Sequence, residues 1–218
     1  MRYTKEDARR IVLNCSKQYR DKLLDKNLLI IYREKDDNSI HKIEVVFRDR
    51  NYQHLTGLEL IDRKGNVIQN QSINFFRKCI ENKLSVNEFR FKDDGTTQLK
   101  LSALPALMDI TKITKITGDY NNRRPFLYVE KVIGGVNFCL GLCKEEKLYV
   151  PSSALCENIK NLTDRPNQVL AIFSKESNSK EIYSSVRHVA KGVNLNNLIL
   201  PDEIRKLITL ENYVYKGK

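Results

Sequence analysis

The first 26 residues alternate between apolar and polar positions with the period of a helix. Thr4 and Asp7 resemble a capping box, with aspartate in place of the usual Glu or Gln, so we expect the helix to begin there and to run to about Lys26. Apolar residues four positions apart would form its buried side: Ile11, Cys15, Tyr19 and Leu23.

A period of two follows and predicts a hairpin of two strands. The first strand covers 28–32, a polar turn covers 36–39, and the second strand continues to about Arg48. Helical spacing then returns, and we expect three more helices: one over 73–83 with Ser72 as N-cap, a short one over 85–89, and one from Ser102 to about Thr114.

After Pro125 the pattern keeps a period of two almost to the end of the chain. The predicted strands are 126–133, 137–143, 147–150, 168–174 and 181–188, followed by a last helix over about 201–210. We therefore predict one α+β domain over 1–218, with N-terminal helices packed against a curved antiparallel β-sheet meander.

Charge gives the first indication of a partner. The chain carries a formal net charge of +11 and has a pI near 9.4. The excess is spread along the sequence instead of being confined to a tail, so a basic surface has to be assembled by folding. Such a surface favours RNA or another nucleic acid as the partner.

The cysteines and the apolar runs indicate a cytoplasmic protein. Five cysteines cannot all pair within one chain, which favours reduced thiols. There is no N-terminal signal-like segment and no apolar run near the roughly 20 residues of a membrane span, so no membrane association is expected.

Several kinds of site are disfavoured by the motifs. Acidic residues are scattered, so no metal and no cofactor is expected. Cys139 and Cys143 would lie roughly 13 Å apart on a straight strand, too far to share one zinc ion, and we interpret them as core residues. No glycine-rich phosphate loop and no Gly-x-Ser-x-Gly sequence is present.

RNA cleavage without a metal fits the remaining side chains. Attack of a 2′-hydroxyl on the adjacent phosphate needs a proton acceptor, a proton donor and cations for the phosphoryl oxygens. The candidate catalytic residues are His54, Lys100, Ser152 and Tyr183. The candidate phosphate- and base-binding residues are Tyr120, Arg123, Arg124, Lys175 and Arg187, with His188 as a second histidine. Structural explanations stay open: His54 could bond to backbone, Ser152 could be an N-cap, and the loop arginines could be solvated.

Five short segments form a further set of motifs: His54-Leu55-Thr56-Gly57-Leu58, Phe75-Phe76-Arg77-Lys78-Cys79, Lys83-Leu84-Ser85, Thr97-Gln98-Leu99-Lys100-Leu101 and Tyr149-Val150-Pro151-Ser152-Ser153. Together they resemble a family of phage and mobile-element proteins of the barnase–EndoU–colicin–RelE-like (BECR) nuclease fold. The resemblance covers about 45–188. It implies helices packed on an antiparallel sheet and an RNase encoded by phages, plasmids or integrated elements of low-GC Gram-positive bacteria. In that family's pattern, His54 and Thr56 belong to the His-Leu-Thr-Gly element, and Lys100 and Ser152 match later polar positions, so Thr56 joins the candidate nucleic-acid-binding residues.

Three functions follow from these observations. The favoured hypothesis is a metal-independent RNA-binding protein that acts as an endoribonuclease, in the manner of a toxin. The alternative is a non-catalytic module of the same fold that binds nucleic acid or a protein partner, either a host defence protein or an antitoxin. A DNA-binding regulator ranks lowest because no helix-turn-helix of suitable spacing occurs. The sequence leaves the oligomeric state open.

Overall fold

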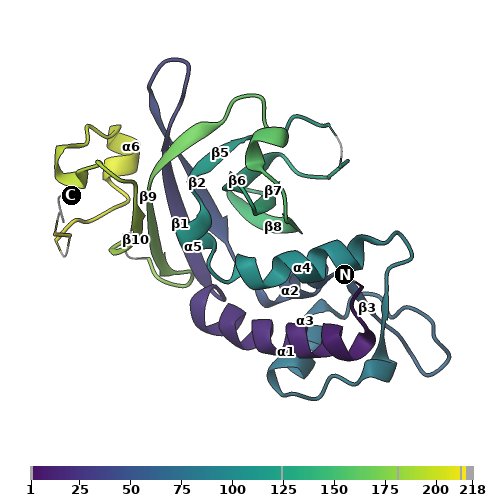
Figure 1. The fold of residues 1–218 in the computed structure, drawn as a ribbon. Helices are drawn as coiled ribbons and strands as arrows, with labels where there is room; N and C mark the ends of the chain where they lie inside the picture. Colours follow the sequence, from purple (N-terminus) through teal and green to yellow (C-terminus); the bar gives the residue numbers. More distant parts are fainter. Residues whose placement is uncertain (1, 124, 181, 212, 215–218) are drawn as a thin grey trace.

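The computed structural model describes residues 2–123, 125–180, 182–211 and 213–214 (Figure 1). The helices are α1 (Lys5–Lys22), α2 (Asp49–Thr56), α3 (Ser72–Ile80), α4 (Thr96–Leu107), α5 (Ile110–Ile113) and α6 (Asp202–Arg205). The strands are β1 (Lys26–Arg33), β2 (Ile40–Val46), β3 (Leu58–Leu60), β4 (Phe89–Phe91), β5 (Ile116–Asp119), β6 (Lys131–Gly134), β7 (Cys139–Glu145), β8 (Leu148–Leu155), β9 (Asn167–Glu176) and β10 (Ser185–Val189).

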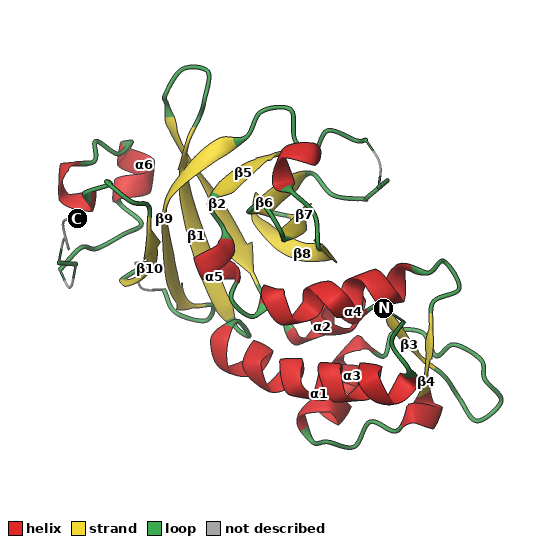
Figure 2. Ribbon diagram, viewed as in Figure 1, coloured by secondary structure: helices red, strands yellow, loops and turns green. Residues whose placement is uncertain are grey.

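The large sheet curls until it closes on itself. Its eight strands follow the order β1-β2-β8-β7-β6-β5-β9-β10, and β1 also pairs with β9, which leaves β10 outside the ring. Neighbouring strands are antiparallel apart from β2 and β8, which are parallel. Helices α1 to α4 lie together below this sheet, and β3 and β4 form a separate two-stranded antiparallel sheet beyond them (Figure 2). The predicted α+β class is thus confirmed.

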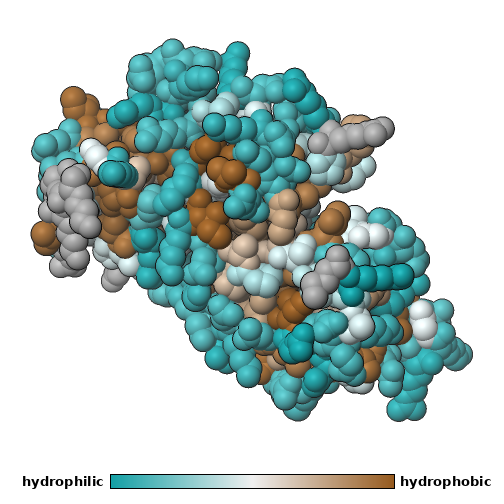
Figure 3. Space-filling model, in the orientation of Figure 1, coloured by the Kyte–Doolittle hydropathy of each residue, from teal (hydrophilic) through white to brown (hydrophobic). Residues whose placement is uncertain are grey.

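Strand β1 is buried on both faces. Leu28 and Ile30 point into the main core, which they share with the helices, whereas Leu29 and Ile31 point into a second apolar cluster beneath the C-terminal segment. Burial on both sides explains why β1 reads as an unbroken apolar run instead of an alternating one. Figure 3 shows hydrophobic residues gathered over the C-terminal segment, at the left of the view.

Helix boundaries differ from the predicted ones where local backbone geometry intervenes. Helix α1 ends at Lys22, because the chain turns through Asp25 with φ 54° to enter β1. Helix α4 begins at Thr96, six residues before the expected Ser102, after Gly95 in the left-handed conformation. Pro105, which had suggested a helix start, lies in the last turn of α4.

The strands predicted after Pro125 lie in the observed sheet, but their first and last residues differ from the predicted ones. Strand β6 begins only at Lys131, β8 continues to Leu155, and β10 covers Ser185–Val189. The last helix, expected over 201–210, is a single turn from Asp202 to Arg205. Helix α2, strand β5 and the two strands β3 and β4 were not predicted as elements.

Candidate nucleic-acid site around His54

Helix α2 places His54 on its open side. The helix follows β2 and buries Tyr52 and Leu55 in the main core, whereas His54, between them in sequence, is exposed. The helix ends at Gly57, whose φ of 71° places it in the left-handed region that favours glycine. A Cβ on Gly57 would lie 3.0 Å from Cα of Thr97, so glycine also permits the close approach of α4.

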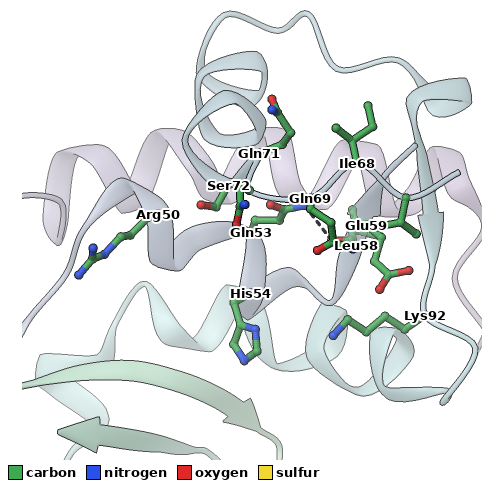
Figure 4. A pocket seen from close by; sticks show the side chains of 12 residues that line it. Arg50, Gln53, His54, Leu58, Glu59, Ile68, Gln69, Gln71, Ser72 and Lys92 are labelled. Carbon is green, nitrogen blue, oxygen red and sulfur yellow. Dashed lines mark hydrogen bonds between the residues drawn. The ribbon is translucent and has the colours of Figure 1, made fainter. Parts of the chain in front are cut away.

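His54 borders a surface hollow of about 300 Å³ (Figure 4). We call this the His54 hollow; its polar lining includes Arg50, Gln53, Glu59, Gln71 and Lys92. The ammonium end of Lys92 is directed toward the imidazole in Figure 4, from the chain that follows β4. Two helices and the β3–β4 region therefore supply its polar groups.

Lys100 approaches His54 from α4. Its Nζ donates a hydrogen bond of 2.8 Å to the backbone carbonyl oxygen of His54. Removal from water and the nearby charge of Lys92 lower the pKa of Lys100 to about 8, and Asp94 opposes that shift. This lysine therefore stays mostly protonated at pH 7 but can release its proton more readily than an ordinary lysine.

The same surroundings keep His54 neutral. Partial removal from water, followed by the positive charges of Lys100 and Lys92, lowers the pKa of His54 to about 4. The exposed ring keeps contact with solvent, which partly screens the two charges. At pH 7 the imidazole is a proton acceptor next to two cations.

A buried threonine holds the three segments of the site together. The Thr97 hydroxyl donates to the carbonyl oxygen of Gly57 at 2.6 Å and accepts from the backbone N–H of Lys92 at 2.9 Å. Thr97 is only 1% exposed. It therefore links the end of α2, the start of α4 and the chain after β4, which carry His54, Lys100 and Lys92.

Thr56 is placed inside the fold and not on the site surface. It is 0% exposed; its hydroxyl donates to the Gln53 carbonyl oxygen and accepts from the Leu58 N–H. The side chain thus closes the end of α2 and presents no surface to nucleic acid, a correction to its expected binding role. The polar residue of the His-Leu-Thr-Gly element that reaches solvent is His54.

Ser152 lies on β8, the strand that packs against both α2 and α4. The pairing of β7 with β8 shifts between Gly141 and Leu142, so Ser152 falls at a β-bulge, and its side chain is half-buried. Bulges often redirect a side chain beside a functional site. Ser152 is absent from the lining of the His54 hollow, and its supporting role stays a prediction.

The residues predicted near the end of the sheet lie elsewhere. Tyr183 is 0% exposed; its hydroxyl donates to Glu44 at 2.9 Å, and Lys175 Nζ lies 4.7 Å from the centre of its ring. Arg187, on β10, donates to the Ser174 hydroxyl and borders a different hollow, of about 340 Å³. His188, which is also on β10, lies beside the ammonium group of Lys115. None of these residues lines the His54 hollow, and burial of Tyr183 corrects its expected catalytic role.

The predicted loop residues form a third location, between β5 and β6. Tyr120 is 6% exposed, and its hydroxyl donates to the carbonyl oxygens of Arg123 and Pro125, so its ring cannot stack on a base. Arg123 is exposed and pairs with Asp164 at 3.1 Å. Arg124 lies outside the described residues.

The structure adds groups that sequence reasoning missed. Lys92, Arg50 and Thr97 belong to the His54 site, yet each sits in an ordinary polar context along the chain. Tyr32 and Tyr149, on the core-facing side of the sheet, lie close enough to Lys131 for its charge to act on the pKa of both tyrosines. Of these two locations, the sequence indicated only the His54 site, through the family motif around Lys100.

Cys139 is buried as expected, whereas Cys143 is only partly buried and Cys156 is exposed. Cys139 and Cys143 each donate to a backbone carbonyl oxygen, at 3.0 and 2.7 Å, and all five thiols are free. Among the described residues, no group of three or more His, Cys, Asp or Glu side chains could hold a metal ion. In the same part of the chain, no helix has the length and apolar character needed to cross a bilayer.

A family comparison identifies the class of protein. The model of the family described as phage-Barnase-EndoU-ColicinE5/D-RelE like nuclease4 matches residues 11–191. The match covers most of the chain, so the protein belongs to this family, and membership supports a nuclease-like function with a nucleic acid as substrate. Searches of curated proteins and of solved structures returned no match.

Proposed function

We propose that the protein is a metal-independent endoribonuclease whose reaction takes place at His54. One observation carries the proposal: an exposed, neutral imidazole lies beside two ammonium groups at the edge of a hollow. A neutral base together with cations is what 2′-hydroxyl attack on phosphate requires. Membership of the nuclease family supports the same chemistry.

The two pKa shifts assign the roles. His54, with its lowered pKa, accepts the proton of the 2′-hydroxyl as its oxygen attacks phosphorus. Lys100 donates a proton to the 5′-oxygen as the bond from phosphorus to that oxygen breaks, and Lys92 stabilises the charge on the phosphoryl oxygens. The products are a 2′,3′-cyclic phosphate and a free 5′-hydroxyl, and one proton is gained and one lost by the protein.

Cleavage of varied RNAs in the presence of EDTA tests the proposal. Wild type is expected to cut, and His54→Ala to lose roughly 100-fold or more in rate, the usual contribution of a positioned acid or base. His41→Ala is the matched control, because His41 is exposed on β2, away from the His54 hollow, where it contacts the Ser39 hydroxyl and the ring of Tyr32. RNA binding without any cleavage would overturn the catalytic proposal and favour a non-catalytic binding module.

The cellular setting that we propose is the cytoplasm of a cell carrying a phage or mobile element. The family description names phages, and free thiols suit a reducing compartment. A toxin-like role, with an antitoxin or host protein as partner, stays a prediction. Co-purification of such a partner with the His54→Ala variant from its native cell would support it.

A further inference from the structure

Two aromatic side chains stand out from the surface between β5 and β6. Phe126 is 78% exposed and Tyr128 is 98% exposed. Large aromatic residues are normally buried, so two exposed rings two residues apart on one segment call for a functional explanation. They lie away from the His54 hollow, and neither ring had been singled out by sequence.

The backbone that carries these rings is held in place. Val129 is buried and Leu127 partly buried in a small apolar cluster with Tyr120, so the side chains alternate between inward and outward. The Cys143 thiol donates to the Tyr128 carbonyl oxygen at 2.7 Å, and Glu130 N–H donates to the Leu142 carbonyl oxygen at 2.8 Å. These contacts fix the segment to β7.

Gly141 shows how closely the segment lies on β7. A Cβ at this position would come within 2.7 Å of Val129, so a larger residue would push the segment away. The Tyr120 hydroxyl, bonded to two carbonyl oxygens, fixes the beginning of the same segment. The two rings therefore project from a preformed support, which lowers the entropic cost of binding a ligand.

Exposed cations lie on the same loop and on the segment that is hydrogen-bonded to it. Arg123 is exposed on the same loop, and Asn121 joins that loop to the segment with Lys160 and Arg165, both exposed. Asp164 pairs with Arg123, and Asp36 pairs with Arg165, so the positive charge is partly balanced but remains accessible. Exposed aromatic rings among cations are the features by which proteins bind single-stranded nucleic acid.

We infer that Phe126 and Tyr128 form a stacking platform for unpaired bases of single-stranded RNA. This inference rests on the proposed function and makes it narrower, since a paired duplex would hide its bases from both rings. Each exposed ring offers a flat face on which one unpaired base can stack.

Tryptophan fluorescence offers a direct test, because the chain contains no tryptophan. In the His54→Ala background, Tyr128→Trp would report stacking as quenching by a single-stranded oligonucleotide. Ile199→Trp is the matched control, since Ile199 is 89% exposed on the distant C-terminal segment. We expect quenching of Trp at 128 by single-stranded RNA, little by duplex or abasic RNA, and none of Trp at 199.

A measurement of RNA affinity is the second test of the stacking platform. Phe126→Ala with Tyr128→Ala should weaken binding of single-stranded RNA at least about ten-fold, with little change for duplex. If RNA binds and is cut by wild type, but the Trp signal and the double variant are unaffected, the inference fails while the proposed function stands. If no RNA binds any variant, both fail, and specific capture of a protein through Phe126 and Tyr128 would replace the inference with a protein-docking role.

Discussion

Two tyrosines of the core differ in what their hydroxyl groups do. Tyr52 is fully buried, and its hydroxyl donates to the Val12 carbonyl oxygen at 2.6 Å, which ties α2 to α1. Tyr32 is 7% exposed, and its hydroxyl has no hydrogen-bond partner among the described residues. Tyr52→Phe should lower the free energy of unfolding by about 1–2 kcal/mol. Tyr32→Phe should change it by less than about 0.5 kcal/mol. Urea denaturation measures both, and equal losses would contradict the assignment.

The pH dependence of cleavage follows from the two shifted groups. His54 has to be neutral, and its pKa lies below 6.5, so the rate should rise with pH on the acid side and level off before neutrality. Lys100 has to be protonated, so the rate should fall as pH rises through about 8. A pH–rate profile of kcat/KM should therefore be bell-shaped.

The charge of Lys92 provides a control for this profile. Because Lys92 lowers the pKa of both His54 and Lys100, Lys92→Met should move both limbs to higher pH while lowering the rate. Lys100→Arg should abolish the alkaline limb, since arginine keeps its proton throughout this range. Limbs that stay in place in both variants would mean that other groups titrate.

At this scale the sequence indicated His54 and Lys100 of the proposed site but not Lys92 or Arg50. His54 stood out as an ionisable side chain in an apolar segment, and Lys100 came with the family motif. The remaining roles depend on how exposed each side chain is in the fold. The sequence does not distinguish Tyr120 from Tyr128, yet Tyr120 is buried and Tyr128 is almost fully exposed. Thr97 belongs to the same motif as Lys100, but nothing in the sequence indicated that its hydroxyl would join three segments.

At the scale of elements, the site depends on how α2, α4 and the end of β4 are joined. Thr97→Val keeps the side-chain shape but removes the hydroxyl, which leaves the Gly57 carbonyl and the Lys92 N–H without that partner. We expect a loss of about 1–3 kcal/mol in unfolding free energy and a fall in cleavage rate, because His54, Lys100 and Lys92 lose their fixed spacing.

Thr117→Val is the matched control for this prediction. Thr117 is also 1% exposed and donates to a backbone carbonyl, that of Val132, but it lies in the β5–β6 pair. It should cost similar stability without lowering the cleavage rate. Equal losses of rate in the two variants would show that Thr97 acts only through stability.

The accuracy of the element predictions follows the strength of local patterns. The long amphipathic α1 and the β1–β2 hairpin were predicted with small errors at their ends, since periodicity and turns determine them. Helix α4 was placed too late, because Pro105 suggested a start whereas the left-handed Gly95 marks the actual one. The closure of the sheet could not be predicted, because pairing of β1 with β9 joins segments far apart in sequence.

At the scale of the whole molecule, the net charge of +11 does not define one binding path. The predicted cations separate into Lys100 near His54, Arg123 in the β5–β6 loop, and Lys175 with Arg187 at the β9–β10 edge. The composition gives only the total charge of the chain, whereas the fold determines which cations share a surface. The first two locations belong to the sites proposed for cleavage and for base stacking, and the third has no assigned part in RNA binding.

Salt dependence distinguishes these locations. In the His54→Ala background, which we expect to bind RNA without cutting it, Lys92→Ala should weaken RNA affinity and reduce the slope of log K against log salt by roughly 0.7, the value for one contact with a single-strand phosphate. Arg187→Ala removes an equal charge at the β10 edge, where its Nε is bonded to Ser174, and should leave the slope unchanged. Fluorescence anisotropy over a salt series measures both. If Arg187→Ala lowers the slope as much as Lys92→Ala, RNA reaches the β9–β10 edge, and the binding path has to extend around the closed sheet instead of running between His54 and the loop.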